Sequence, residues 1–346
     1  MADRTRENRR LDEDDVRIRP TRNGSRPRSK QRPAHAEATD ATVVTVDRGR
    51  YTVLADTESD GEDVLVTAMR ARELGRKGIA VGDRVSVIGD LSGAPDALAR
   101  IVRLSERRTV LRRSADDSDP FERVVVANAD QLMIVTALAE PGPRFGLIDR
   151  CVVAALTAGM EPVLCLTKSD LAGPAATLAR YEQLELPHVV LQRGSDLAEL
   201  RARLAGSVSV FVGHSGVGKS TLINALVPDA HRATGLVSAI GKGRHTSSSA
   251  VALRLPDRSG WVIDTPGIRS FGLAHVGADD MLWAFPDLED GAARCPPGCE
   301  HLHAAAGCRL DEWVVQGNST AERLDAFRRL LSSRGSADEA HGGDDQ

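Results

Sequence analysis

The stretch that decides the fold is Ser207–Asn224, SVSVFVGHSGVGKSTLIN. Its first part, from Val208 to Val212, is apolar and predicts a buried strand, whereas the part from Thr221 onward predicts a helix. Between them, Gly213–Ser220 fits the phosphate-loop pattern G-x-x-x-x-G-K-[ST]. Glycines let backbone N–H groups close around an anion, and the helix N-terminus that follows adds positive potential. The stretch therefore predicts a nucleotide site.

Two side chains of this loop have distinct predicted roles. Lys219 would reach the terminal phosphates, and Ser220 would hold Mg²⁺. The whole loop is predicted to contact the nucleotide through Gly213, His214, Ser215, Gly216, Val217, Gly218, Lys219, Ser220 and Thr221.

The composition bounds the class of protein. The 346 residues suffice for two or three domains, and an aromatic content of 3% means that aliphatic side chains must fill the cores. We find neither an apolar run of about 18 residues nor a charged-then-apolar leader, so we expect a cytoplasmic protein without a membrane partner. The net charge of −4 hides a basic start and an acidic end, and therefore says little about partners.

The chain before the phosphate loop changes character twice. Residues 1–33 carry eleven basic and six acidic side chains with almost nothing to bury, which predicts a disordered arm, either a solvated tail or one drawn to nucleic acid.

Five short strands follow between Ala41 and Leu111, which favours an OB-fold barrel. Tyr51 is its only aromatic residue, so a base-stacking platform is missing. Arginines at the barrel exit could contact phosphates or merely form a charged connector: Arg107, Arg108, Arg112 and Arg113.

After a polar linker at Asp116–Pro120, strand and helix patterns alternate and predict a parallel α/β sheet that includes the phosphate-loop strand. One predicted strand, Glu161–Thr167, ends in Thr167-Lys168-Ser169-Asp170, a form of the guanine-recognition pattern [NT]-K-x-D. The Asp170 carboxylate can accept both the N1–H and the 2-amino group of guanine, which adenine does not present together. These four residues therefore predict selection of GTP over ATP.

Downstream, Trp261–Gly267 predicts another strand that ends in a D-x-x-G turn. Asp264 would hold Mg²⁺ through water, and the Gly267 N–H would sense the γ-phosphate. The polar segment Gly241–Ser249 precedes it, and its Thr246 could supply the Mg²⁺-coordinating hydroxyl of a first switch. On composition alone, that segment could equally be a solvent loop.

A cluster of cysteines and histidines lies near the C-terminus. Cys295, Cys299 and Cys308 with His301 form a good tetrahedral Zn²⁺ set, and four protein ligands would make the site structural. His303 could compete with His301 for the fourth position, and a metal-free loop is the alternative. A final amphipathic helix is predicted over 321–331, and the other two cysteines, Cys151 and Cys165, have apolar surroundings typical of core residues.

The order of these motifs is unusual, because the guanine pattern precedes the phosphate loop, the switch and the D-x-x-G turn. With a barrel before it and a Cys/His cluster after it, the chain resembles the ribosome small-subunit-dependent GTPase A family over about residues 40–331. Further matches are Val81-Gly82-Asp83-Arg84-Val85, Asn128-Ala129-Asp130-Gln131 and Gly243-Arg244-His245-Thr246. The spacing in the cysteine cluster departs from that family on both sides of His301.

The resemblance implies a GTPase that binds the small ribosomal subunit and its rRNA, assists late maturation and hydrolyses GTP faster on the subunit. Ile268 occupies the position where many GTPases carry a water-positioning glutamine, so the resemblance implies His245 in that role, with His214 as a weaker substitute. The alternatives are a P-loop kinase or ATPase acting on a small molecule, and a noncatalytic module that GTP merely orders. Expected cofactors are GTP as substrate, Mg²⁺ and one structural Zn²⁺, and we expect a monomer.

The predicted architecture is multi-domain. It comprises a disordered basic extension over 1–39, a five-stranded OB-fold β-barrel over 40–113, a circularly permuted α/β P-loop GTPase domain over 114–272, a mostly helical zinc-binding domain over 273–334 and a disordered acidic tail over 335–346.

Overall fold

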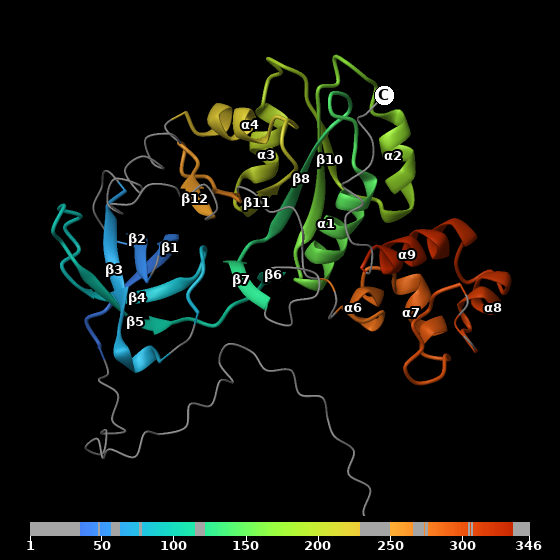
Figure 1. Cartoon of the computed structure of the whole chain (residues 1–346), viewed down its shortest axis with the longest axis horizontal. Coiled ribbons are helices and arrows are strands. Elements are labelled where there is room, and N and C mark those ends of the chain that lie inside the picture. The colour runs from blue at the N-terminus through green and yellow to red at the C-terminus, as the bar shows by residue number, and fades with distance from the viewer. Residues whose placement is uncertain are drawn as a thin grey trace, which may run out of the picture.

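The computed structural model describes residues 35–47, 49–56, 63–75, 78–114, 122–228, 250–265, 273, 276–303, 305 and 307–334. In Figure 1 the chain runs from a barrel through a sheet with helices on both faces to a group of short helices. The predicted N-terminal arm, the acidic tail, the first-switch segment and Gly267 lie outside the described residues, apart from the last residues of the arm.

The barrel closes through its strand pairing. Its strands are β1 (Thr39–Asp47), β2 (Arg50–Ala55), β3 (Leu65–Arg70), β4 (Arg84–Gly89) and β5 (Ala99–Leu104). They pair in the order β1-β2-β3-β5-β4, and β4 returns to β1, so that no edge of this set is left open. Alternate residues such as Val43, Val53 and Ile101 are fully buried inside. The five predicted strands and the barrel are confirmed.

A two-stranded hairpin, which we did not predict, follows the barrel. It consists of β6 (Val110–Ser114) and β7 (Glu122–Ala127). Leu111 and Val126 are buried at 2% and 0% exposure and belong to the main core. The hairpin therefore packs against the main core.

The central sheet has the order β10-β9-β8-β11-β13-β12. Its strands are β8 (Gln131–Ala137), β9 (Glu161–Thr167), β10 (His188–Val190), β11 (Val208–Val212), β12 (Val251–Arg254) and β13 (Trp261–Asp264). The first five strands in this order are parallel, as predicted, whereas the short strand β12, which we did not predict, runs antiparallel to β13. Through the pair Thr45–Val251, β12 also joins β1, so one eleven-stranded sheet runs through both parts.

Helices cover both faces of this sheet (Figure 1). They are α1 (Phe145–Thr157), α2 (Ala175–Tyr181), α3 (Ala198–Leu204) and α4 (Lys219–Leu226). Short 3-10 turns lie at Arg72–Leu74 and Glu182–Leu184. Neighbouring residues of β8 divide between two cores, because successive strand side chains point to opposite faces. Leu132 and Ile134 pack with α1, whereas Met133 and Val135 pack with α3 and α4.

The C-terminal part is helical, as predicted. Its helices are α6 (Asp279–Leu282), α7 (Pro286–Ala292), α8 (Leu310–Val315) and α9 (Ala321–Ser333). The Thr320 hydroxyl caps α9 by accepting from Arg323 N at 3.2 Å. The apolar side of α9 is buried against α1 and also contacts α8, and the rings of Phe285 and Phe327 pack edge to face with their centroids 5.0 Å apart. Within the described ranges, no helix has the length and apolar content needed to cross a bilayer.

Candidate nucleotide site and metal cluster

The phosphate loop turns sharply at the end of β11. A Cβ atom on Gly213 would lie 2.5 Å from the Val135 carbonyl oxygen, so only glycine fits there. Gly216 and Gly218 have φ of +84° and +90°, the left-handed region in which glycine carries no steric penalty. Lys219 then begins α4, which places backbone N–H groups and a helix N-terminus around the loop. This geometry fits a bound phosphate chain.

Lys219 lies beside the carboxylate predicted to work with it. Its Nζ donates to Asp264 Oδ1, and the two side chains are 10% and 26% exposed. The parallel pairing of β11 with β13 brings them together, since Phe211 and Asp264 are register partners. The Thr265 hydroxyl donates to the Phe211 carbonyl at 2.7 Å and fixes the chain just after Asp264. The lysine and the D-x-x-G aspartate therefore share one edge of the sheet.

The guanine-recognition residues lie at the same edge, at the end of β9. The Thr167 hydroxyl is 2.7 Å from the carbonyl oxygen of Val217 in the phosphate loop and 3.3 Å from that of Thr136. Ser169 N donates to the Leu191 carbonyl at 3.1 Å, and Asp170 is exposed. The fold thus brings together two motifs that are more than forty residues apart, with Thr167 in direct contact with the phosphate loop.

A third segment borders this site and was missed in the sequence. The loop after β8 places Pro141 Cδ 3.4 Å from where a Cβ of Gly216 would lie, and its Glu140 carbonyl accepts from Lys168 Nζ. No motif marks this loop. The only available signal was its place at the carboxyl end of a strand, and ligands of open α/β sheets bind at that edge.

Of the two histidines considered for positioning the attacking water, the structure describes His214 but not His245. His214 is partly buried, and its Nδ1 lies 2.9 Å from the Ser215 carbonyl. Burial lowers the pKa of His214 below its ordinary value of 6.5, so its imidazole is neutral near pH 7. Within the described part of the chain its Nε2 is buried and has no hydrogen-bond partner. His245 lies outside the described residues, as does Thr246.

Two of the four arginines at the barrel exit, Arg107 and Arg108, form ion pairs with carboxylates of the protein. Arg107 donates from Nε and Nη2 to the two carboxylate oxygens of Asp83 at 2.7 and 2.8 Å, and from Nη2 to the Gly78 carbonyl. Asp83 is fully buried, so this pair is part of the barrel's packing. Arg108 forms an ion pair with Asp130 at 3.1 Å. The structure therefore favours the connector interpretation over phosphate contact for Arg107, whereas the Arg108 side chain is 67% exposed.

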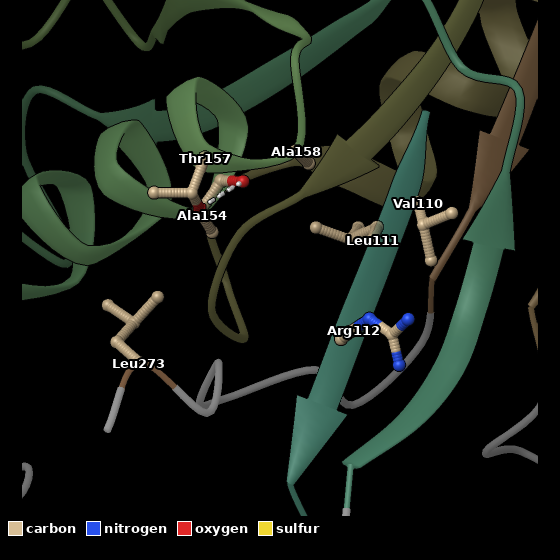
Figure 2. Close-up of a pocket in the computed structure, with 7 residues that line it drawn as sticks. All are labelled: Val110, Leu111, Arg112, Ala154, Thr157, Ala158 and Leu273. Atoms are coloured by element: carbon tan, nitrogen blue, oxygen red, sulfur yellow. Dashed lines mark hydrogen bonds between the residues drawn. The ribbon is translucent and has the colours of Figure 1, made fainter. Parts of the chain in front are cut away.

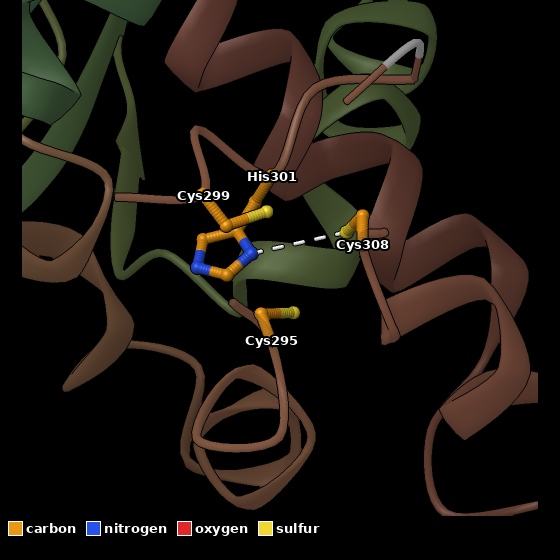
Figure 3. Close-up of side chains that lie close together, drawn as sticks. All are labelled: Cys295, Cys299, His301 and Cys308. Carbon is orange, nitrogen blue, oxygen red and sulfur yellow. Dashed lines mark hydrogen bonds between the residues drawn. The ribbon is translucent and has the colours of Figure 1, made fainter. Parts of the chain in front are cut away.

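The four C-terminal metal-ligand candidates converge in space (Figure 3). One donor atom from each of Cys295, Cys299, His301 and Cys308 lies within 4.8 Å of the other three. Cys308 Sγ is 3.8 Å from His301 Nδ1, close to the separation of about 3.6 Å between thiolate and imidazole donors around a tetrahedral zinc ion. His303 is exposed and is absent from the cluster. The donor set and its spacing fit Zn²⁺ with small movements.

The surroundings of His301 also suit a ligand. The residue is 2% exposed, and burial lowers the pKa of its imidazole, which favours the neutral form that binds metal. With Nδ1 facing Cys308, its Nε2 lies 3.8 Å from Asp279 Oδ1. Carboxylates that face the free nitrogen of a ligand histidine commonly fix its orientation.

A small cavity lies away from both sites (Figure 2). Its volume is about 90 Å³, and it is lined by Val110, Leu111, Arg112, Ala154, Thr157, Ala158 and Leu273. The Thr157 hydroxyl already donates to the Val153 carbonyl at 2.9 Å in its own helix. The cavity therefore brings no reactive group to either candidate site.

The fold and the order of its motifs define a circularly permuted GTPase. The crystal structure of YloQ, a circularly permuted GTPase, matches with a TM-score of 0.60 at 22% identity, covering 87% of this chain and 96% of that one. YjeQ from Thermotoga maritima matches with a TM-score of 0.59 at 25% identity, covering 87% and 100%.

The family follows from closer relatives. Residues 104–274 match the family model RsgA GTPase. A Nitrosospira multiformis protein is 35% identical over 280 residues, covering 79% of this chain and 85% of the relative. A Pseudomonas aeruginosa protein is 40% identical over 243 residues, covering 67% and 70%. A third, from Ectopseudomonas mendocina, is 42% identical over 219 residues, covering 60% and 63%. All three are named small ribosomal subunit biogenesis GTPase RsgA. This chain belongs to the RsgA GTPase family.

Proposed function

We propose that this chain hydrolyses GTP to GDP and phosphate in assisting late maturation of the small ribosomal subunit, and that the bound subunit stimulates hydrolysis. The proposal is supported by the relatives' names and by one contact in particular. The Thr167 hydroxyl donates to the Val217 carbonyl and so joins a guanine-reading loop to a phosphate loop. A kinase or ATPase has no need for that contact, and family membership also favours the GTPase.

Each residue of the nucleotide site is assigned the role expected from its motif. Asp170 would accept the guanine N1–H and 2-amino group, with Lys168 along the base and Ser169 in the same turn. Lys219 would contact the β- and γ-phosphates together with the loop's N–H groups. Mg²⁺, which supplies charge neutralisation when bound, would be held by Ser220 and by Asp264 through water.

The remaining roles rest on residues outside the described part. Thr246 would coordinate Mg²⁺, Gly267 would sense the γ-phosphate, and His245 would position the attacking water, because Ile268 has no polar group for that role. The Cys295, Cys299, His301 and Cys308 cluster would hold one structural Zn²⁺. We further propose a cytoplasmic monomer with domain boundaries near residues 40, 114 and 273.

Contact with rRNA would use an exposed row on the barrel. Arg50 is the register partner of Met69, and Met69 is the partner of Arg100, so the three side chains project from one face of β2, β3 and β5. Met69 is 45% exposed, and both arginines are exposed. The long arginines would reach phosphates, and this face is the one on which OB-folds commonly bind nucleic acid.

The deciding experiment is steady-state hydrolysis by the purified chain, alone and with purified small ribosomal subunits, with ATP as the control nucleotide. Stimulation by the subunit that is confined to GTP supports the proposal. A slow rate indifferent to the subunit would leave the GTPase standing and remove the ribosomal role. His245→Ala should abolish the stimulated part while preserving GDP affinity.

A further inference from the structure

A buried arginine lies next to the metal cluster. Arg328 projects from α9, and only 3% of its side chain is exposed. Its Nε donates to the His301 carbonyl at 3.0 Å, while Nη1 and Nη2 donate to the two oxygens of Asp311 at 2.7 and 2.6 Å. A charge buried to this degree is rare unless it is fully paired. Here the guanidinium has charge-assisted bonds on both sides of its fork.

The two hydrogen-bond partners of Arg328 lie at or near two of the metal-ligand candidates. His301 is itself a ligand candidate, and Asp311 lies in the first turn of α8, three residues after Cys308. Arg309, between them, donates its N–H to Cys295 Sγ at 3.2 Å. One side chain on a long helix therefore fixes the backbone beside the histidine ligand and beside the last cysteine ligand.

The backbone of His301 needs such support. Its φ is +56°, in the left-handed region that residues other than glycine seldom adopt. Conformations of this kind persist where the surroundings over-determine them. The hydrogen bond from Arg328 to the His301 carbonyl holds this peptide and leaves Nδ1 facing Cys308 at 3.8 Å.

We propose that Arg328 is the positioning residue of this metal site, and the proposal rests on the zinc site proposed above. It holds the His301 and Cys308 segments in place before the ion arrives, so that less ordering must accompany binding. Loss of outer-shell partners of metal ligands typically costs about 10–100-fold in metal affinity. Lysine cannot replace it, because one ammonium group cannot span the His301 carbonyl and both Asp311 oxygens.

The test measures metal binding by the full-length chain. Zn²⁺ affinity comes from competition with a chromogenic chelator, and Co²⁺ absorption reports thiolate ligation and tetrahedral geometry. Arg328→Met should weaken Zn²⁺ binding about 10–100-fold and alter the Co²⁺ bands. Arg328→Lys should recover little of that loss.

The matched control is Arg329→Met on the same helix. Arg329 faces the other way, toward Asp149 at 3.5 Å and the Arg180 carbonyl at 3.2 Å, so its loss should lower the Tm and preserve zinc affinity. Equal weakening by both variants would show a general stability effect and overturn the proposal. So would wild-type affinity and Co²⁺ bands in Arg328→Met.

If Arg328→Met does not fold, Asp311→Asn and Arg328→Lys decide the matter. Both keep a polar group in place, and weaker zinc binding by each supports the proposal, whereas wild-type binding by each overturns it. A wild-type chain that takes up neither Zn²⁺ nor Co²⁺ would remove the zinc site and this inference together. A wild type that binds zinc, with unaffected variants, would remove only the inference.

Discussion

Replacing Thr167 by valine removes one hydroxyl from the contact between the guanine loop and the phosphate loop, and almost nothing else. The residue is 8% exposed, and valine preserves its branched shape. The hydroxyl proton can serve only one acceptor well, and the Val217 carbonyl at 2.7 Å is much closer than that of Thr136 at 3.3 Å. Leaving a buried acceptor without its donor costs about 1–3 kcal/mol. We expect Thr167→Val to lose that amount from the free energy of unfolding.

The neighbouring strand provides a matched control. Thr136 is 2% exposed, and within the described part of the chain its hydroxyl is buried with no hydrogen-bond partner. Thr136→Val therefore removes an unpaired polar group, and should range from neutral to a stabilisation of about 1 kcal/mol. The two substitutions are chemically identical, so only their hydrogen bonding separates them.

Urea unfolding with and without GDP measures both effects. If the free-energy cost of Thr167→Val appeared entirely in nucleotide binding instead of folding, about 1–3 kcal/mol would correspond to a roughly 5- to 150-fold weaker GDP affinity. For each variant, the loss of unfolding free energy and the loss of GDP-binding free energy are added. This sum should be larger for Thr167→Val than for Thr136→Val by at least about 1 kcal/mol. Equal unfolding free energies and equal GDP affinities for the two variants would refute the link between the loops.

Three further outcomes are expected. Asp170→Asn should lose GTP affinity and gain xanthosine triphosphate affinity, because an amide can donate to the 2-oxo group of xanthine; a competition assay with unchanged preference would contradict the assigned role. Burial raises the pKa of Asp149 above its ordinary 3.8, so its stabilising contribution is full below about pH 4 and is lost as the pH rises through the folded pKa. The Tm of the wild type should therefore fall relative to Asp149→Asn as the pH rises from about 4, and a constant difference would count against this. Arg50→Gln with Arg100→Gln should weaken subunit binding and reduce its salt slope by about 2; an unchanged slope would place the RNA contact elsewhere.

The parts of the fold that could be predicted from sequence are those specified by local pattern. Apolar alternation around residues such as Val43 and Val53 marked the barrel strands, and contiguous motifs marked the loops at Lys219 and Asp170. The hairpin at 110–127 was missed because three arginines and an acidic linker dominate its composition. The charge of Arg107 is balanced by Asp83, and only the closed barrel brings that pair together.

The motifs of the nucleotide site could be predicted from the sequence, but the contacts between these motifs could not. The bond from Thr167 to Val217 and the contact of Pro141 with the glycine turn both depend on β8 lying between β9 and β11. Sheet order is a long-range property that no single motif encodes. The choice between His301 and His303 depended similarly on α9, whose Arg328 lies 3.2 Å from His303 Nδ1 outside the cluster.

The pairing of Thr45 with Val251 limits how this protein can be recombined with its relatives. Asp63 adds to the same junction, since it forms ion pairs with Arg254 at 2.9 Å and with Arg258 at 3.1 Å. A chimera cut after the barrel sequence would retain strand β12 from one parent and its partner β1 from another. The segment to exchange is therefore discontinuous. A foreign barrel should be transplanted together with strand β12 and the turn that carries Arg258, although about two hundred residues separate Thr45 from Val251 in the chain.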